Sequence, residues 1–371
     1  MNVFVAADNV FTPLGKTTAE NFTALKQGWS GVKRHLDTNI SAEPIVASLF
    51  DENFTAQEPY TKFEQLLIAS IDDALKQSGV NAADEKTILI ISSTKGNISL
   101  LETEENTPEL QKRIALSTSA KLVAEHFGFV NQPIVISNAC VSGVMALITG
   151  MRLLRTGEYQ NAVVAGADTI SKFILAGFQS FQALSPEVCR PFDSLRNGLN
   201  LGEGAATLVL SSDKKYTGNI RIKGGGISND ANHISGPSRT GQELAYAIQQ
   251  SITDAGHSAA DIDFISAHGT ATLYNDEMEA NAIALSGLQQ VPLNSLKGYY
   301  GHTLGAAGLI ESVISMQSLK KGFFLPTPGY TETGVTHAVN VSSSVRHINA
   351  TNVLKTASGF GGCNAAVVFG K

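Results

Sequence analysis

The residue whose type and position most directly indicate chemistry is Cys140. Residues 133–137 (PIVIS) have the apolar, β-branched character of a buried strand, and residues 141–159 have the pattern of a helix lined with small side chains. The thiol at this junction faces the unpaired N–H groups and the positive dipole end of the helix, which lower the pKa of a cysteine and favour its thiolate. We therefore predict that Cys140 is a nucleophile. A buried structural cysteine is the alternative for such a residue taken alone.

Two later segments contain the groups that such a nucleophile needs. His268 follows an apolar strand predicted at 262–267, and Lys297 lies five residues before His302. An imidazole exchanges a proton near neutral pH and donates hydrogen bonds to a developing anion. A thiol combined with two imidazoles and an ammonium group points to carbon–carbon bond formation on thioesters.

The elements that must position these residues occur twice along the chain. In each copy an amphipathic helix is followed by an Ala-Ala-Asp turn and an apolar strand, at 63–80 and 87–91 and again at 242–256 and 262–267. The strand 202–210 also recurs, as 361–369. A repeat of this length indicates a duplicated domain, and alternating strands and helices indicate mixed α/β layers. We predict two related halves, residues 1–212 and 213–371, divided in the polar stretch 211–219, with functional residues of both halves meeting between them.

Small residues recur in two of the predicted helices, at 141–159 and about 303–320. Glycine costs up to about 1 kcal/mol in a helix interior, so its repeated use needs a packing reason. We expect close approach of two central helices sandwiched between sheets. The small residues are Gly143, Ala146, Gly150, Gly305, Ala306, Ala307 and Gly308.

The composition excludes several classes of protein. The chain has 371 residues, of which 43% are hydrophobic and only 16% charged, which suits a compact enzyme and argues against disorder. The net charge is −6 and no Lys/Arg block stands out, so we expect no nucleic-acid partner. Charge or glycine interrupts every apolar run before it could cross a bilayer, so we expect no membrane insertion.

The start of the chain and its cysteines indicate where the protein resides. Residues 1–8 lack a basic segment and become polar too soon for a signal peptide. The three cysteines, Cys140, Cys189 and Cys363, cannot all pair and lack the spacing of zinc ligands. We therefore expect a reduced, cytoplasmic protein without a metal.

At this point a family resemblance is plain. Residues 137–143 (SNACVSG) resemble the active-site turn of the elongating β-ketoacyl-[acyl-carrier-protein] synthases, which belong to the thiolase-fold superfamily. The resemblance extends from Thr12 almost to the C-terminus. The other matching motifs are RPFD at 190–193, RNG at 196–198, LGEGA at 201–205, AHGTAT at 267–272, NSLK at 294–297, GHTLGAAG at 301–308 and GFGGCN at 359–364.

The resemblance implies a fold and a reaction. The fold is α/β and thiolase-like, with two duplicated βαβαβαββ halves forming a layered α/β/α/β/α sandwich. The reaction is decarboxylative Claisen condensation of an acyl thioester held on Cys140 with malonyl-acyl carrier protein, in fatty acid or related polyketide or polyene synthesis. No cofactor is implied for the chain itself, because the phosphopantetheine arm arrives on the acyl carrier protein. A dimer through the strand 133–137, with an identical chain or a related synthase subunit, is also implied.

The resemblance also assigns roles to single residues. His268 and His302 handle the malonyl thioester, and the backbone N–H groups of Cys140 and Phe360 stabilise the oxyanion. Lys297 orders the base of the site. Glu311 supports the site by pairing with Lys297. Thr270 and Thr272 hydrogen-bond the phosphopantetheine arm of the substrate. Asp276 and Glu279 are expected to start a helix and brace the histidine loop.

Some positions depart from the family pattern. Ser358 stands where elongating synthases often carry a second phenylalanine, Cys363 replaces a common threonine, and Asn138 replaces a small or hydroxyl residue. The stretch between about 34 and 132, which caps the acyl pocket, is shorter than usual. A smaller gate and an altered cap suggest a specialised acyl chain, polyunsaturated or aryl-primed.

Two other functions remain open from the sequence. A chain-length factor, the non-catalytic partner subunit of a heterodimeric synthase, usually lacks the cysteine that is present here. A thiolase uses a second cysteine near its C-terminus, but Cys363 follows Gly361-Gly362, whereas the thiolase cysteine precedes its glycines.

Overall fold

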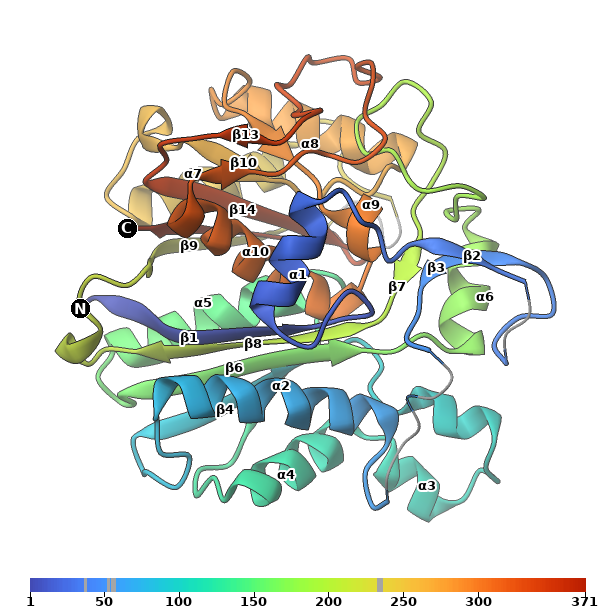
Figure 1. Ribbon diagram of the computed structural model, residues 1–371, viewed down its shortest axis with the longest axis vertical. Helices are drawn as coiled ribbons and strands as arrows, with labels where there is room; N and C mark the ends of the chain where they lie inside the picture. Colours follow the sequence, from blue (N-terminus) through green and yellow to red (C-terminus); the bar gives the residue numbers. More distant parts are fainter. Residues whose placement is uncertain (37–38, 52–53, 55–57, 232–235) are drawn as a thin grey trace.

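The computed structural model describes residues 1–36, 39–51, 54, 58–231 and 236–371. Its centre is a ten-stranded mixed sheet in the order β11-β10-β14-β15-β9-β1-β8-β6-β4-β5 (Figure 1). The strands from the first half of the chain are β1 (Val3–Phe11), β4 (Thr87–Ser92), β5 (Ile134–Ile136), β6 (Asn161–Asp168) and β8 (Gly204–Ser211). Those from the second half are β9 (Arg221–Asn229), β10 (Phe264–Ser266), β11 (Leu293–Asn294), β14 (Asn352–Gly359) and β15 (Cys363–Gly370).

The two sets of strands have the same topology. In the first set β8 lies antiparallel between β1 and β6, and β6, β4 and β5 run parallel. In the second set β15 lies antiparallel between β9 and β14, and β14, β10 and β11 run parallel. The predicted duplication is therefore confirmed. The two sets join through a short antiparallel pairing of β1 with β9, Val3 with Ile222 and Phe4 with Arg221. The division at residues 212 and 213 stays a prediction, and it falls between β8 and β9.

Helices complete the predicted α/β/α/β/α layers (Figure 1). The central layer consists of α5 (Ser142–Arg155) and α10 (Ala307–Lys321), which lie between the two sets of strands. One outer layer, against the first set, contains α2 (Lys62–Ser78) and α4 (Leu116–Phe127). The other, against the second set, contains α7 (Gln242–Asp254) and α8 (Leu273–Leu285).

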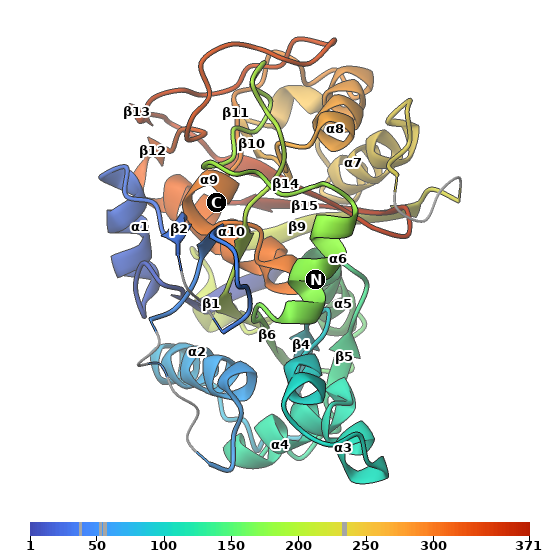
Figure 2. The same ribbon diagram turned by 90° about the vertical axis from the view of Figure 1, so that its right-hand side faces the viewer.

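Shorter elements lie at the ends of these layers. The remaining helices are α1 (Thr18–Lys26), α3 (Pro108–Arg113), α6 (Lys172–Ser180) and α9 (Lys297–Tyr300), with 3-10 turns η1 (Ile98–Glu102), η2 (Lys214–Tyr216), η3 (Ala259–Asp261) and η4 (Leu304–Ala306). Two small sheets contain β2 (Lys33–His35), β3 (Ile45–Ser48) and β7 (Leu201–Gly202), and β12 (Phe323–Phe324) and β13 (Arg346–His347). Turning the molecule by 90° brings α6 to the front, on the side where α9 also lies (Figure 2).

Local signals explain where several elements begin and end. Thr61 and Glu64 form a capping box at the start of α2, and Gly79 ends that helix with a φ of +64°. The helix predicted at 141–159 is shorter, because the chain turns at Gly157, which has a φ of +79°. The strand predicted at 133–137 forms as β5, but it is half-buried at the edge of the sheet, so our expectation of a buried strand was wrong.

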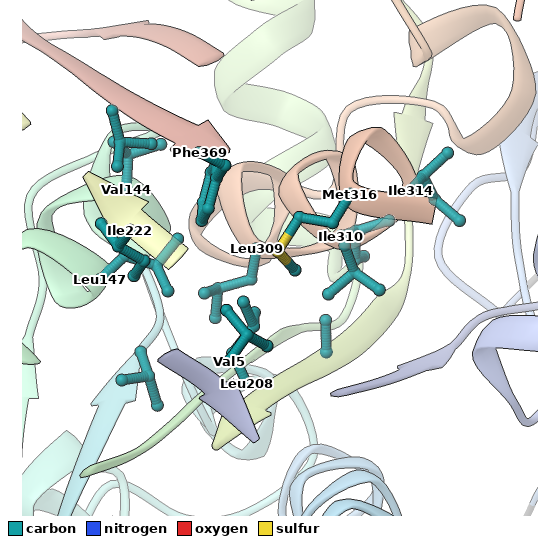
Figure 3. Close-up of a cluster of buried hydrophobic side chains, with 14 of the residues drawn as sticks. Val5, Val144, Leu147, Leu208, Ile222, Leu309, Ile310, Ile314, Met316 and Phe369 are labelled. Carbon is teal, nitrogen blue, oxygen red and sulfur yellow. The ribbon is translucent and has the colours of Figure 1, made fainter. Parts of the chain in front are cut away.

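Side chains from both halves fill one core around the central helices (Figure 3). Leu309 and Ile310 of α10 lie between side chains of both sets of strands, among them Leu208 of β8 and Phe369 of β15. All four are fully buried. The halves thus share the largest apolar cluster among the described residues, and smaller clusters lie under the outer helices of each set of strands.

The predicted close approach of the central helices is confirmed at Gly143 and Gly308. A methyl group on Gly143 would lie 2.9 Å from the Leu309 amide nitrogen and 3.0 Å from the Gly305 carbonyl oxygen. One on Gly308 would lie 2.8 Å from the Val144 amide nitrogen. The main chain of α5 contacts the main chain at the start of α10, so a larger residue at either glycine would push the two helices apart.

We expect Gly143→Ala to lower the free energy of unfolding by about 1–3 kcal/mol, because the added methyl meets main-chain atoms that cannot rotate away. Urea denaturation measures this change. Gly177→Ala in α6 is the matched control, since nothing lies within 4 Å of a methyl group there. Alanine favours a helix by about 1 kcal/mol over glycine, so the control should be neutral or stabilising. Equal effects at the two positions would contradict the close packing.

Candidate active site

One cavity of about 390 Å³ brings the predicted chemical groups together. Cys140 reaches it from the turn before α5, His268 from the loop after β10, and His302 from the loop between α9 and η4. Phe360, Thr270 and Thr272 also line it. Lys297 and Glu311 do not line the cavity but lie behind His268 in the protein interior. The meeting of residues from both halves is thus as predicted.

The turn that carries Cys140 is closed by its own hydrogen bonds. The Ser142 hydroxyl donates to the Ala139 carbonyl oxygen at 2.6 Å and accepts from the Asn138 amide at 2.8 Å. Ala139 has a φ of +45°, a conformation that costs a residue with a side chain roughly 1 kcal/mol or more. Such a turn aims the next side chain, that of Cys140, away from β5 and toward the cavity.

Burial controls the ionisation of Cys140. Removal from water raises the pKa of this thiol to about 12, although the positive charge of Lys297 opposes the rise. Our prediction of a lowered pKa was therefore wrong. Desolvation disfavours the thiolate more than the nearby positive charge and the start of α5 favour it. The raised pKa favours the protonated thiol over the thiolate.

The C-terminal turn packs directly against the cysteine turn. A methyl group on Gly359 would lie 3.0 Å from the Cys140 amide nitrogen, so a larger residue would displace that N–H. The turn bends sharply, with φ of +85° at Gly361 and +76° at Gly362. The ring of Phe360 stacks on Phe178 of α6, with centroids 5.9 Å apart. These contacts hold the turn that begins at Gly359 against the Cys140 amide.

The two imidazole rings contact each other edge to face. Their centroids are 5.3 Å apart at an interplanar angle of 80°, and both side chains are buried. Burial and the charge of Lys297 hold the pKa of both imidazoles well below the ordinary value of 6.5. Both rings are therefore neutral at physiological pH. Within the described residues, the Nδ1 atom of His302 is buried without a hydrogen-bond partner.

Carboxylates of α8 brace the loop that carries His268, as predicted. Glu279 accepts hydrogen bonds from the amides of His268 at 2.8 Å and Gly269 at 2.7 Å. Asp276 accepts from the Thr270 amide at 2.9 Å. The hydroxyl oxygens of Thr270 and Thr272 lie 2.9 Å apart at the cavity wall. The loop is rigid because its main-chain donors have fixed acceptors.

Lys297 determines the tautomer of His268. Its ammonium group donates to the His268 carbonyl oxygen at 2.6 Å and to Glu311 Oε1 at 2.8 Å, and it lies 3.4 Å from His268 Nδ1. An ammonium group has no acceptor, so Nδ1 must present its lone pair and the ring proton must be on Nε2. The predicted Lys297–Glu311 pair is confirmed, and it is fully buried rather than exposed.

The sequence analysis missed three residues that shape the site. Lys355 of β14 is fully buried and contacts the other oxygen of Glu311, Oε2, at 2.7 Å. The sequence did contain a sign that Lys355 is unusual, because a lysine lies within the otherwise apolar strand NVLKTAS. Phe178 and Phe181 of α6 line the cavity beside Phe360, and no pattern in the sequence connects them to it.

Asp168 at the end of β6 ties the two halves together next to the site. Its carboxylate accepts from the Ser93 hydroxyl at 2.7 Å and from the Gly305 amide at 2.6 Å. Burial raises the pKa of Asp168 to about 6. The carboxylate therefore joins the end of β4 to the turn that follows His302.

The described residues contain neither a metal-ligand cluster nor a membrane-spanning helix. No cluster of three or more His, Cys, Asp or Glu side chains is arranged to hold a metal ion in the ranges that the structure describes. In the same ranges, no helix combines the length and the apolar character needed to span a membrane.

Comparison with known proteins identifies the family. The N-terminal domain of β-ketoacyl synthases matches residues 2–215, and the C-terminal domain of β-ketoacyl synthases matches residues 220–331. A putative mitochondrial 3-oxoacyl-[acyl-carrier-protein] synthase of Schizosaccharomyces pombe is 30% identical over 330 residues, which cover 82% of this chain and 72% of the relative. The 3-oxoacyl-[acyl-carrier-protein] synthase 2 of Vibrio cholerae is 29% identical and covers 99% of this chain and 98% of its own.

Solved structures that resemble this chain support the same family assignment. The ishigamide ketosynthase/chain length factor superposes with a TM-score of 0.90 at 26% identity, covering 100% of this chain and 99% of that chain. A β-ketoacyl synthase from Burkholderia phymatum superposes with a TM-score of 0.88 at 26% identity, with the same coverage of both chains. The fold is the thiolase-like fold expected from the motifs. The chain therefore belongs to the β-ketoacyl synthase family and is an acyltransferase that makes β-ketoacyl thioesters by condensation.

Proposed function

We propose that Cys140 carries the acyl chain and that His268 and His302 activate the malonyl thioester. The observation that supports these roles is the single cavity into which one thiol and two neutral imidazoles project. In the first step the Cys140 sulfur attacks the acyl thioester carbonyl. A new carbon–sulfur bond forms, the bond to the carrier thiol breaks, and the proton of Cys140 passes to the departing thiol. Because burial raises the pKa of Cys140, the proposal has this proton leave during the attack and not before it.

The second step uses the histidines. Loss of CO₂ from the malonyl thioester leaves an enolate, whose oxygen accepts hydrogen bonds from the imidazoles. His268 has its ring proton on Nε2, and Lys297 holds it in that tautomer. The enolate carbon attacks the acyl group, and the bond to Cys140 breaks. The departing thiolate takes up a proton from water, which regenerates the thiol as the β-ketoacyl product forms.

Two main-chain donors serve the acyl carbonyl in both steps. We assign the oxyanion to the N–H groups of Cys140 and Phe360, because Gly359, which precedes Phe360, packs against the Cys140 amide. One such donor is typically worth about 10²–10³ in rate. Gly361 and Gly362 adopt the positive φ that this turn needs.

An acyl carrier protein delivers both substrates in this proposal. The phosphopantetheine arm enters along Thr270 and Thr272, whose hydroxyl groups line the cavity, and the enzyme holds no cofactor of its own. Apolar side chains at the cavity lining, Phe181, Leu273 and Tyr274, are more than half exposed and suit the arm of a carrier.

The edge strand β5 suits a dimer. Ile134, Val135 and Ile136 are apolar yet half-buried, and β5 ends the sheet with one unpaired side. An exposed apolar edge strand favours pairing with another strand. We propose that residues 133–137 pair with the same strand of a second chain, identical or a related synthase subunit.

A chain-length-factor-like partner subunit is the second candidate. The match to the ishigamide ketosynthase/chain length factor supports it, since that structure contains both kinds of subunit by name. A partner subunit would need no nucleophile. The presence of Cys140 in a complete cavity favours the catalytic role, and acylation of Cys140 decides between the two.

Mass spectrometry of the protein after incubation with acyl carrier should find the acyl group on Cys140 and not on Cys189 or Cys363. His302→Ala should keep this acylation but lose about 10²-fold or more in malonyl decarboxylation, because it removes only the second-step donor. Cys140→Ala is the control and should lose acylation and condensation together. An unlabelled Cys140 would favour the partner-subunit role, and loss of acylation alone in His302→Ala would refute our division of roles.

The pH dependence of decarboxylation follows from the neutral imidazoles. Because their pKa lies well below 6.5, they take up protons only at pH well below 6.5, so the rate should stay level from pH 8 to about 6 and fall further below. The free energy of unfolding should change in the same direction. A histidine whose pKa is lower in the folded state than in the unfolded state makes the folded protein less stable as the pH falls below the unfolded-state pKa. A rate that already halves at pH 6.5 or above would contradict neutral histidines.

Ser358 is expected to influence the length of acyl chain that the cavity accepts. It is buried, lines the cavity and donates to Asn364 Oδ1 at 2.8 Å. Ser358→Phe adds a ring to the cavity wall, so long acyl donors should lose at least about tenfold in kcat/KM while short ones lose little. A panel of acyl carriers of increasing chain length, with product masses, measures this. Uniform loss across the panel would show that Ser358 does not limit the acyl pocket.

A further inference from the structure

Lys355 is a second buried ammonium group behind the histidines. It lies on β14 opposite Ser266 of β10, and it is fully buried. Its Nζ atom lies 2.7 Å from Glu311 Oε2 and 3.2 Å from each of the carbonyl oxygens of Ser266 and Ala267. All three neighbours are acceptors, and the ion pair with Glu311 favours the ammonium form against burial, which lowers the pKa of Lys355. A buried ammonium costs several kcal/mol unless it is paired, and here one carboxylate and two carbonyl oxygens offset that cost.

The carboxylate of Glu311 serves two cations at once. Lys297 contacts Oε1 and Lys355 contacts Oε2, at 2.8 and 2.7 Å. One negative charge therefore faces two positive charges in the interior, and Glu311 itself stays ionised because both ammonium groups lower its pKa against the effect of burial. Taken alone, these three groups carry one net positive charge behind the imidazoles, and Glu279 is a further carboxylate that faces Lys355. A single Lys–Glu pair would have been neutral.

Lys355 also holds the backbone that leads into the site. Ser266 and Ala267 immediately precede His268, and their carbonyl oxygens both point at Nζ. Lys297 holds the next carbonyl, that of His268, at 2.6 Å. Three consecutive carbonyl groups are thus bound by two ammonium groups that share one carboxylate.

We propose that Lys355 is a positioning residue for the decarboxylation step. It orients Glu311 and thereby Lys297, it anchors the peptide groups before His268, and its charge disfavours protonation of both imidazoles. Among the described residues, the charged and titratable groups that face this cluster include Lys297 from α9, Glu311 from α10, Glu279 from α8, the two histidines, Cys140 and Tyr300. This inference rests on the roles proposed for His268 and His302.

The test compares Lys355→Met with Lys320→Met. Lys320 also forms an ion pair, with Asp8 at 3.2 Å, but far from the cavity, so it controls for the loss of a lysine–carboxylate contact. We expect Lys355→Met to acylate Cys140 within about threefold of the parent and to lose about 10–100-fold in malonyl decarboxylation. Its acidic midpoint for decarboxylation should rise by about one pH unit, because removing a positive charge raises the pKa of the imidazoles. Lys320→Met should match the parent protein in Cys140 acylation, in the rate of malonyl decarboxylation and in the acidic midpoint of that rate.

Equal losses of acylation and decarboxylation with an unmoved midpoint would overturn the proposal, because a purely structural role predicts that result. Lys355→Gln keeps two N–H donors and removes the charge, so it should fold and show the same rise in midpoint. If both Lys355→Met and Lys355→Gln fail to fold, Lys355 is required for folding itself, and the proposal fails. Failure of the proposed function is seen separately, as retained decarboxylation in His302→Ala with Lys355 intact.

Discussion

The contact between α5 and α10 is the constraint on which the site depends. Gly143 lies against the main chain of Gly305 and Leu309, and Gly308 lies against that of Val144, so the helices approach to backbone contact near their N-terminal ends. Each helix follows a turn that carries a reactive side chain, Cys140 in one case and His302 in the other. The sulfur and the imidazole share a cavity because the helices that follow them touch.

The same burial has opposite effects on the groups in that cavity. Removal from water disfavours charge, so it raises the pKa of the Cys140 thiol and lowers the pKa of His268 and His302. Both effects suit a condensation that starts from a protonated thiol and ends with neutral imidazole donors facing an enolate. The positive charge of Lys297 adds to the effect on the histidines and opposes the effect on the cysteine. Around Glu311, one buried carboxylate contacts two buried lysines.

Motif residues were predictable because each carries its chemistry in a short stretch of chain. Cys140, His268, His302 and Phe360 reach the cavity as expected, and Glu279 braces the histidine loop as expected. Predictions failed where the outcome depends on surroundings built by distant segments. The ionisation of Cys140 depends on how much water the whole fold excludes, and the exposure of β5 depends on the sheet ending there in a single chain.

The sequence by itself determined the duplicated α/β layers, the turn that carries the nucleophile and the residue types available for condensation, because periodicity, glycine positions and motifs are local properties. Only the tertiary structure decided that Lys355 shares Glu311 with Lys297, that Phe178 and Phe181 of α6 line the cavity, and that burial raises the pKa of the Cys140 thiol. These features depend on long-range packing and on the exclusion of water. Both come from residues far apart in the chain, whose positions no local pattern specifies.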